Sequence, residues 1–164
     1  MTDGPGRDGP RYEDDFYAWT QFQAEVLRAL PVSDNRFDRE HLAEEIEDLG
    51  KSERDAVRSQ IARIVEHLLK LAYSQADRPR YGWMASIVDA RRIVEDKLSP
   101  TLRHDLETSL PRIYRSARKS AELGMLEYGE TEAVALLPAQ CPYSLEQLVA
   151  GDWYPEPAEK QNEP

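Results

Sequence analysis

The sequence has little of what secreted, disulfide-rich or membrane-spanning proteins require. Cys141 is its single cysteine, which excludes an internal disulfide and fits a reducing compartment. The longest uninterrupted apolar run is 133–137, far short of the roughly 20 residues that cross a bilayer. Residues 1–10 are polar and lack the apolar core of a signal peptide. These absences predict a cytoplasmic protein that does not enter a membrane.

Motifs of the common catalytic and cofactor-binding sites are also missing. The sequence has no glycine-rich phosphate loop, no Gly-x-Ser-x-Gly and no zinc-ligand spacing. A ferritin-like di-iron site needs Glu-x-x-His on two helices, and none is present. Cys141 precedes a proline and has no histidine nearby, which argues against a nucleophile. The sequence therefore predicts no cofactor and favours a protein that is not an enzyme, without deciding that question.

Charge is abundant but unevenly placed. The net charge is −10, with 32% charged and 40% hydrophobic residues in a chain of 164. Residues 1–50 carry 5 basic and 13 acidic groups, whereas residues 78–119 carry 10 basic and 5 acidic groups. The whole chain should repel nucleic acid and anionic membranes at long range. The basic middle segment should pack beside the acidic ones within one fold.

The longest helical signal lies at 38–74. Its second part has apolar residues at steps of four and three, which place them on one helix face. They are Val57, Ile61, Ile64, Leu68 and Leu71. Unbroken, this stretch would span about 55 Å, against a radius of gyration of about 15 Å for a globule of this length. Gly50 and Ser52 resemble a helix stop and a new cap, so we expect a kink or break near Gly50.

The same reasoning predicts helices at about 13–30, 38–49, 52–74, 81–98 and 100–123 and a short one between Ser144 and Gly151. The first helix should bury Phe16, Trp19, Gln23, Val26, Leu27 and Leu30. Residues 124–140 are expected to be irregular, with 133–137 anchored to the core. The predicted fold is all-α: a single-domain antiparallel helical bundle over 12–155, with four to five main helices, a short C-terminal helix and disordered tails at 1–11 and 156–164.

Five stretches resemble a known family. They are YEDDFYAWTQFQAEVLRAL at 12–30, LAEEIEDLGKSER at 42–54, EHLLKL at 66–71, GWMASI at 82–87 and CPYSLEQL at 141–148. In this order they are similar to the bacterial family known as domain of unknown function 29. The resemblance covers nearly everything except the tails and implies an all-helical fold. It implies no reaction, substrate or cofactor.

A polar cluster is the first candidate site. His67 flanks the apolar stripe, where a titratable side chain is sheltered but not sealed. Arg91 falls on the stripe of its helix and should seek a polar niche or an acid. Glu45 could fold toward His67 if the chain bends at Gly50, with Lys70 nearby. The three side chains would then hold an anion or polarise a substrate, although a structural ion-pair network would use the same residues.

Two further candidate sites rest on weaker patterns. His41 and Glu45 are one helical turn apart and could share a metal ion, but an exposed, salt-bridged acidic helix face is the favoured explanation. The basic residues Arg112, Arg115, Arg118 and Lys119 lie on one side of their helix and could follow a phosphate backbone. They lack interleaved aromatic residues, so a solvated or internally paired face is favoured.

Three functions remain open from sequence. The first is a non-catalytic interaction or assembly module that binds a protein partner or itself. The second is an enzyme or metal-dependent protein that uses His67, Glu45 and Arg91. The third is a nucleic-acid-binding factor that uses the stripe from Arg112 to Lys119, which the acidic net charge disfavours.

Overall fold

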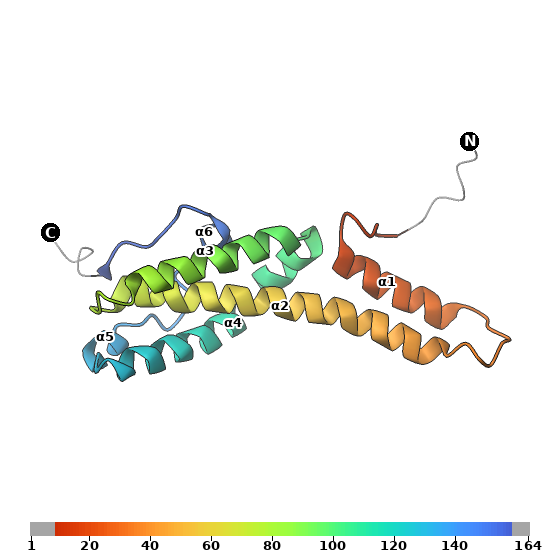
Figure 1. Ribbon diagram of the computed structural model, residues 1–164, viewed down its shortest axis with the longest axis horizontal. Coiled ribbons are helices and arrows are strands. Elements are labelled where there is room, and N and C mark those ends of the chain that lie inside the picture. The colour runs from red at the N-terminus through yellow and green to blue at the C-terminus, as the bar shows by residue number, and fades with distance from the viewer. Residues whose placement is uncertain (1–8, 159–164) are drawn as a thin grey trace. The chain divides into compact units, whose positions relative to one another are not determined.

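The computed structural model describes residues 9–158, and within them the protein is helical with no strand. The predicted all-α class is confirmed (Figure 1). The helices are α1 (Phe16–Ala29), α2 (Arg39–Tyr73), α3 (Arg80–Lys97), α4 (Pro100–Glu127), α5 (Thr131–Ala135) and α6 (Leu145–Val149). No helix among the described residues is long and apolar enough to cross a bilayer. Most of both tails predicted to be disordered, 1–8 and 159–164, lies outside the described residues.

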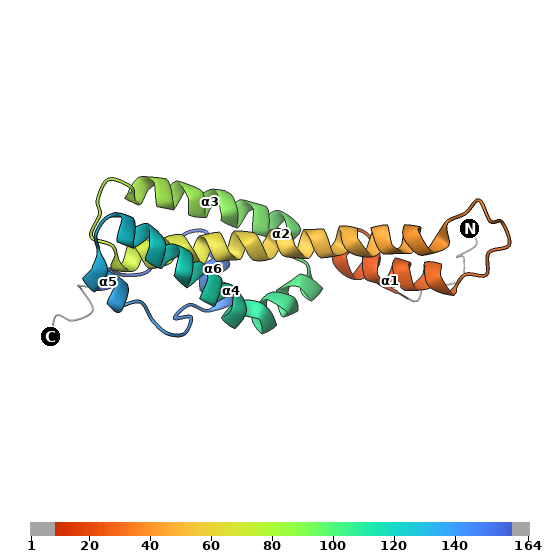
Figure 2. The ribbon, with the colours of Figure 1, turned by 90° about the horizontal axis from the view of Figure 1, so that it is seen from below.

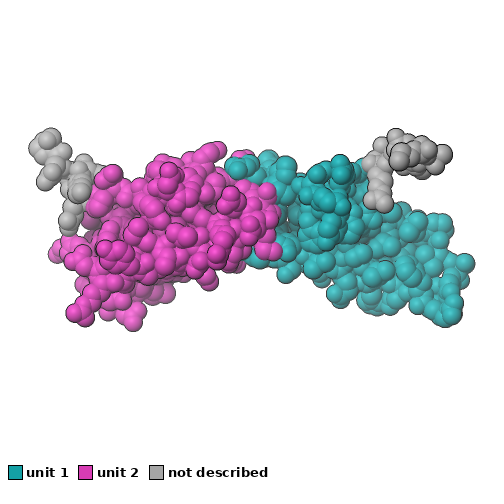
Figure 3. Space-filling model, turned by 45° about the horizontal axis from the view of Figure 1, so that its top comes forward, with its two compact units in different colours: residues 1–56, 99–104 teal, residues 57–98, 105–164 magenta. Residues whose placement is uncertain are grey.

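The chain divides into two compact units (Figure 3). Unit 1 comprises Met1–Ala56 and Ser99–His104, and therefore holds α1 and the first half of α2. Unit 2 comprises Val57–Leu98 and Asp105–Pro164, and therefore holds the rest of α2, α3, most of α4, α5 and α6. Each unit has its own buried residues, and the two cores differ in kind.

Unit 2 has a core of large aliphatic side chains. The predicted stripe of α2 is buried along its length, from Val57 to Leu71. Other helices contribute the buried residues Trp83, Ile87, Ala90 and Val94 from α3, and Ile113, Ala117 and Ala121 from α4. Burial of one such side chain stabilises a fold by about 1.5–3 kcal/mol, so these residues account for the stability of the unit.

One prediction within unit 2 was wrong. Residues 124–140 were expected to be irregular, but α4 continues through Gly124 to Glu127, and α5 follows. Gly124 suits the helix because Lys70 lies across it, with Nζ 2.6 Å from where a Cβ would stand. The helix also runs through Pro111, and Ser109 Oγ donates to the Asp105 carbonyl at 2.6 Å. The expected anchoring of 133–137 is confirmed, since Ala133 and Leu137 are buried.

Unit 1 is built on a helical hairpin, in which α1 runs antiparallel to the first half of α2 (Figure 2). Asp15 caps α1 through a hydrogen bond that Ala18 N donates at 2.9 Å, so the helix begins at Phe16 and not at residue 13. The other oxygen of Asp15 accepts from Thr101 N, which ties α1 to the start of α4. Burial of Asp15 acts to raise its pKa, but the hydrogen bonds from Ala18, Thr101 and Ser99 together outweigh that effect, so the pKa of Asp15 lies below its ordinary value.

The predicted kink or break near Gly50 was wrong: α2 is one unbroken helix from Arg39 to Tyr73. Gly50 is the place where α1 comes closest to α2. A Cβ on Gly50 would lie 1.9 Å from Thr20 Oγ1 and 2.8 Å from Gln21 Nε2. Gln21 uses this approach to donate a 3.1 Å hydrogen bond to the Glu47 carbonyl. The glycine is therefore a packing residue, not a helix stop.

The predicted buried face of α1 was also wrong. Thr20 and Ala24 are the buried residues of this helix, whereas Val26 and Leu30 are exposed. In the first half of α2 the small residues Ala43 and Gly50 are buried. A close helix crossing leaves room only for small side chains at its centre. The larger apolar side chains consequently lie beside the contact.

We expect Gly50→Ala to destabilise unit 1 by about 1–3 kcal/mol, because the new methyl group overlaps Thr20. This loss should appear although alanine is favoured over glycine in a helix by about 1 kcal/mol. Hydrogen exchange of the α1 and α2 amides, followed by mass spectrometry, measures the change locally.

Gly82→Ala is the matched control, because Gly82 is also helical and a Cβ there would meet nothing within 4 Å. It should leave its helix equally or better protected. Equal gains from both substitutions would contradict close packing at Gly50.

Candidate functional site

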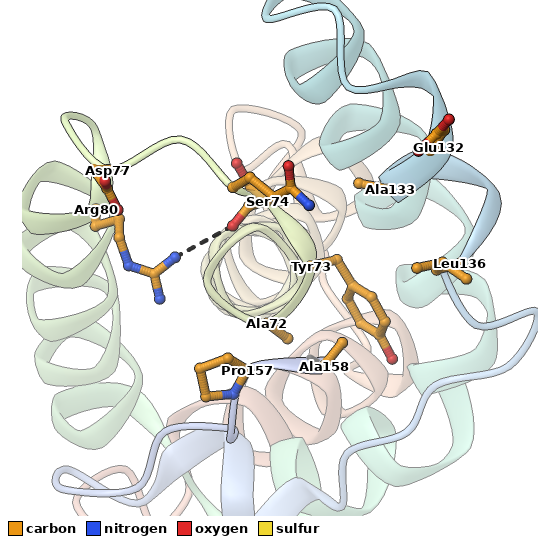
Figure 4. A pocket seen from close by; sticks show the side chains of 11 residues that line it. Ala72, Tyr73, Ser74, Asp77, Arg80, Glu132, Ala133, Leu136, Pro157 and Ala158 are labelled. Carbon is orange, nitrogen blue, oxygen red and sulfur yellow. Dashed lines mark hydrogen bonds between the residues drawn. The ribbon is translucent and has the colours of Figure 1, made fainter. Parts of the chain in front are cut away.

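The described residues contain a hollow of about 690 Å³ at the C-terminal end of α2. Figure 4 shows the end of α2 at its centre, with Asp77 and Arg80 on one side and Glu132 and Leu136 on the other. Pro157 and Ala158 complete the lining. Both acids and one base face the same space, so no single ligand charge is favoured.

The polar groups around this hollow close the end of α2. Arg80 donates to the carbonyls of Leu71 at 2.9 Å and Ser74 at 3.4 Å (Figure 4). Glu130 Oε1 accepts from Ser74 Oγ, Gln75 N and Ala76 N at 2.7–3.1 Å. A helix end leaves backbone groups unpaired, and these side chains satisfy them. The arrangement is explained by the fold and needs no ligand.

His67 is half-buried on α2, as its position beside the stripe predicted. Its Nδ1 is buried and has no hydrogen-bond partner among residues 9–158. Burial lowers the pKa of His67, with a smaller opposing effect from Glu66 and further lowering by Lys70 and Arg63. Lys70 Nζ lies 2.6 Å from Glu66 Oε1 and 5.9 Å from the centre of the Trp83 ring. Lys70 is thus paired with Glu66 and not with the predicted cluster.

The predicted cluster of His67, Glu45 and Arg91 does not form. Glu45 and His67 lie about six turns apart on one continuous helix, roughly 33 Å of rise, because α2 has no break at Gly50 to bring them together. Arg91 is engaged elsewhere. The expected bend was the premise of the cluster, and its absence removes the cluster.

Arg91 holds the C-terminal segment to α3. It is 5% exposed, and its guanidinium donates to four backbone carbonyls. The acceptors are Leu148 at 2.9 Å, Trp153 at 2.8 Å, Gln147 at 3.2 Å and Gly151 at 3.4 Å. The Tyr154 ring centre lies 5.2 Å from Cζ of Arg91. Burial lowers the pKa of Arg91, and the nearby Tyr154 and Asp152 oppose that effect.

The C-terminal segment forms the short helix predicted between Ser144 and Gly151, and a capping box begins it. Ser144 Oγ accepts from Gln147 N, and Gln147 Oε1 accepts from Ser144 N. Leu145 and Leu148 are buried, so α6 packs back on the unit. Arg91 completes the other end of α6, where a cation stabilises free carbonyls. The predicted polar niche for Arg91 is therefore the end of a helix.

His41 makes a hydrogen bond within its own helical turn. Its Nδ1 lies 2.7 Å from Asp38 Oδ2, and this bond with the neighbouring carboxylates raises the pKa of His41. The described residues contain no group of three histidine, cysteine or acidic side chains placed to hold a metal ion. His41 and Glu45 therefore find no third donor in residues 9–158.

The basic stripe is divided between internal and exposed positions. Arg118 donates to the Pro138 carbonyl at 2.9 Å and the Leu137 carbonyl at 3.2 Å, and Lys119 lies 2.9 Å from Glu122. Arg112 and Arg115 are exposed. Of the predicted nucleic-acid surface, Arg118 thus supports the segment after α5, and Lys119 pairs with a carboxylate of its own helix.

The largest departure from the sequence expectation is an apolar face on the hairpin of unit 1. We call it the hairpin face, and it consists of Phe16, Trp19, Gln23, Val26 and Leu30 of α1 with Leu42, Ile46 and Leu49 of α2. Val26, Leu30, Leu42 and Leu49 are 37%, 44%, 41% and 52% exposed. Tyr12 packs edge-on against Phe16 and Trp19 at centroid distances of 5.2 and 4.9 Å.

Both halves of this face lie on the same side of the hairpin. In each helix the residues of the face come directly before contact positions. The pairs are Trp19–Thr20 and Gln23–Ala24 in α1, and Leu42–Ala43 and Leu49–Gly50 in α2. In a helix, the side chain one position earlier in the sequence points about 100° away around the helix axis. Because the two helices run in opposite directions, that rotation takes both rows of side chains to the same side.

The hairpin face is uncharged along α1 and acidic along its α2 edge. The charged residues of α1, Glu25 and Arg28, point elsewhere: Glu25 follows Ala24 to the opposite side, and Arg28 pairs with Glu47 of α2. On α2, Asp38 and Glu45 follow the outer edge of the face. The sequence contained the necessary signal, a heptad-like spacing at 16, 19, 23, 26 and 30, but that spacing was assigned to the core.

The pKa values of the two histidines on α2 should shift in opposite directions from the ordinary value. The pKa of His41 should lie above 6.5 and that of His67 below it, because a carboxylate stabilises the first imidazolium and burial opposes the second. As pH falls below about 6.5, protonation of the unfolded chain at His67 lowers stability. The His41 contribution has the opposite sign: it is present at low pH and is lost as pH rises through its folded pKa.

Nuclear magnetic resonance of the imidazole C–H signals measures both midpoints, with His41→Asn and His67→Asn for assignment. Coinciding midpoints would show that His67 is solvated.

We expect Arg91→Met to lower the free energy of unfolding by about 2–4 kcal/mol, since four carbonyls lose a charged donor. Exchange of the amides at 144–154 should rise with it. Arg92→Met is the control, because the neighbouring Arg92 is exposed and pairs only with Asp89 in its own turn. Equal stability of the two variants would show that the C-terminal segment is held by its apolar side chains alone.

Comparison with known proteins agrees with the fold and adds no activity. The chain is similar to an alpha-helical protein of unknown function from Rhodospirillum rubrum, solved by crystallography at 1.45 Å resolution. The two share 26% identity and a TM-score of 0.75, over 89% of this chain and 93% of the other. A search of curated proteins finds none that matches.

A family model matches residues 11–154, which is most of the chain and includes both helices of the hairpin. The resemblance seen in the five sequence stretches is therefore confirmed, and the chain belongs to the family described as domain of unknown function DUF29.

Proposed function

We propose that this protein is a non-catalytic interaction module that binds a protein partner through the hairpin face. One observation carries the proposal: the row of apolar side chains on α1 has the spacing of a packed helix, yet within the described chain it is only half-buried at Phe16 and Trp19 and exposed at Val26 and Leu30. Val26 and Leu30 lie beside Leu42 and Leu49 on one side of unit 1, and all four are exposed. Contiguous exposed apolar surface of this kind is typical of protein–protein interfaces.

The construction of unit 1 supports the same function. A two-helix hairpin joined by small residues buries little apolar area, so it gains from a third element that covers its open face. The single cysteine and the lack of a spanning helix among the described residues support placing this module in the cytoplasm.

The catalytic alternative has less support. Arg91 is occupied by four carbonyls, Lys70 by Glu66, and Glu45 is remote from His67 along α2. The nucleic-acid alternative loses Arg118 to backbone carbonyls and Lys119 to a pairing with Glu122, which leaves Arg112 and Arg115 on a chain of net charge −10.

Site-specific photo-crosslinking in cells tests the proposal. A photoreactive amino acid replacing Leu49 should give a discrete adduct, because that side chain stands on the hairpin face. The same amino acid replacing Glu25, which is exposed on the opposite side of α1, is the control and should not.

Val26→Asp combined with Leu30→Asp should abolish the Leu49 adduct while far-ultraviolet circular dichroism stays unchanged, since both positions are exposed. No adduct from Leu49, or the same adducts from both positions, would contradict the proposal.

A further inference from the structure

We propose that the partner of the hairpin face is a basic amphipathic helix of another protein, which lies between α1 and α2 and completes a three-helix bundle. This inference rests on the proposed function and adds the chemistry of the ligand. It follows from the shape, the length and the charge of the face.

The two helices of the hairpin form a groove in which a third helix can pack. Two antiparallel helices in contact lie about 8–10 Å apart, and a third helix packs in the groove between them. The hairpin face supplies a row of apolar side chains on each side of this groove. On α1 the row repeats at steps of three and four residues, from Phe16 to Leu30, which is the spacing that meets another helix. A strand or an irregular loop would not match this period.

The length sets the size of the ligand. The α1 row extends over about 21 Å at roughly 1.5 Å per residue, so it matches a helix of about 14 residues. The aromatic cluster of Tyr12, Phe16 and Trp19 lies at one end of the row and the aliphatic Val26 and Leu30 toward the other. Large aromatic side chains dominate binding at helix-in-groove interfaces.

The charge selects a basic helix. The described part of unit 1 carries seven lysine or arginine residues against thirteen aspartate or glutamate residues. At the edge of the face, the carboxylate of Glu45 is exposed and makes no ion pair within residues 9–158. Asp38 lies along the same edge, paired with His41. A partner helix with lysine or arginine on the flank next to α2 would meet these carboxylates, and the α1 flank presents no charge.

The same charge argues against a second copy on this face. Two copies would bring together surfaces of equal negative charge, which costs free energy at low ionic strength. Association of the chain with itself is therefore an outcome that the experiment must be able to detect.

The experiment uses the full chain and two synthetic helices of 18 residues. Both peptides have leucine at the a and d positions, and they differ only in carrying lysine or glutamate on the flanks. Fluorescence anisotropy of a labelled peptide gives Kd. The lysine peptide should bind at least tenfold more tightly than the glutamate peptide, and the difference should shrink as salt rises. Val26→Ser with Leu49→Ser should abolish binding.

Two charge reversals separate a docked helix from general attraction to an acidic protein. Glu45→Lys, at the edge of the hairpin face, should raise the Kd of the lysine peptide about threefold to fivefold, because one exposed ion pair is replaced by repulsion. Glu44→Lys changes the net charge equally but lies on the other side of α2, and it should change Kd less than twofold. Equal effects of Glu44→Lys and Glu45→Lys would overturn the inference.

The remaining outcomes are also decisive. Equal affinity for both peptides, or no binding of either, overturns the basic-helix partner. If a Leu49 adduct nevertheless forms in cells, the interaction function stands and only its partner class is wrong. A dimer in sedimentation equilibrium that Leu49→Ser dissociates would assign the face to a second copy instead.

Discussion

The close approach of α1 to α2 at Gly50 is the constraint on which unit 1 depends. A Cβ at that position would overlap Thr20, so the two helices meet through small residues and a side-chain hydrogen bond to the Glu47 carbonyl. The crossing excludes large side chains from its centre. Val26, Leu30, Leu42 and Leu49 are consequently displaced to the side, where they form the hairpin face. The exposed apolar hairpin face is thus a direct result of how the hairpin is closed.

In unit 2 the second half of α2 is packed differently, because its large apolar side chains are buried and not exposed. Beyond Val57, the inward side of α2 carries large aliphatic residues that α3 and α4 cover, and no comparable apolar row remains open along it. Two of its arginines serve the backbone: the buried Arg91 completes α6, and the half-buried Arg118 holds the segment after α5. Such positions resemble active-site residues in a sequence, because a buried charge needs a reason. Here the reason is an unpaired carbonyl.

Some features of the candidate sites follow from helical period, and others depend on tertiary packing. The position of His67 beside the stripe and the niche for Arg91 followed from helical period alone. The joining of His67 with Glu45 needed a bend at Gly50, and the direction of the chain after a glycine depends on what packs against it. In α1 the apolar row was identified correctly, but burial was assigned to it by default. Whether a row is core or interface depends on whether another element of the chain covers it.

What the sequence by itself determined is therefore local: the helical class, the α2 stripe from Val57 to Leu71, the short helix that begins after Ser144, and the family. These features depend on the period of apolar residues and on hydrogen bonds within a few residues. Tertiary structure alone decided that Gly50 is a contact and not a stop, that Arg91 caps α6, and that the α1 row stays open. Each of those features depends on residues that are distant in the chain. Local helix propensity does not determine which distant residues pack against a given segment.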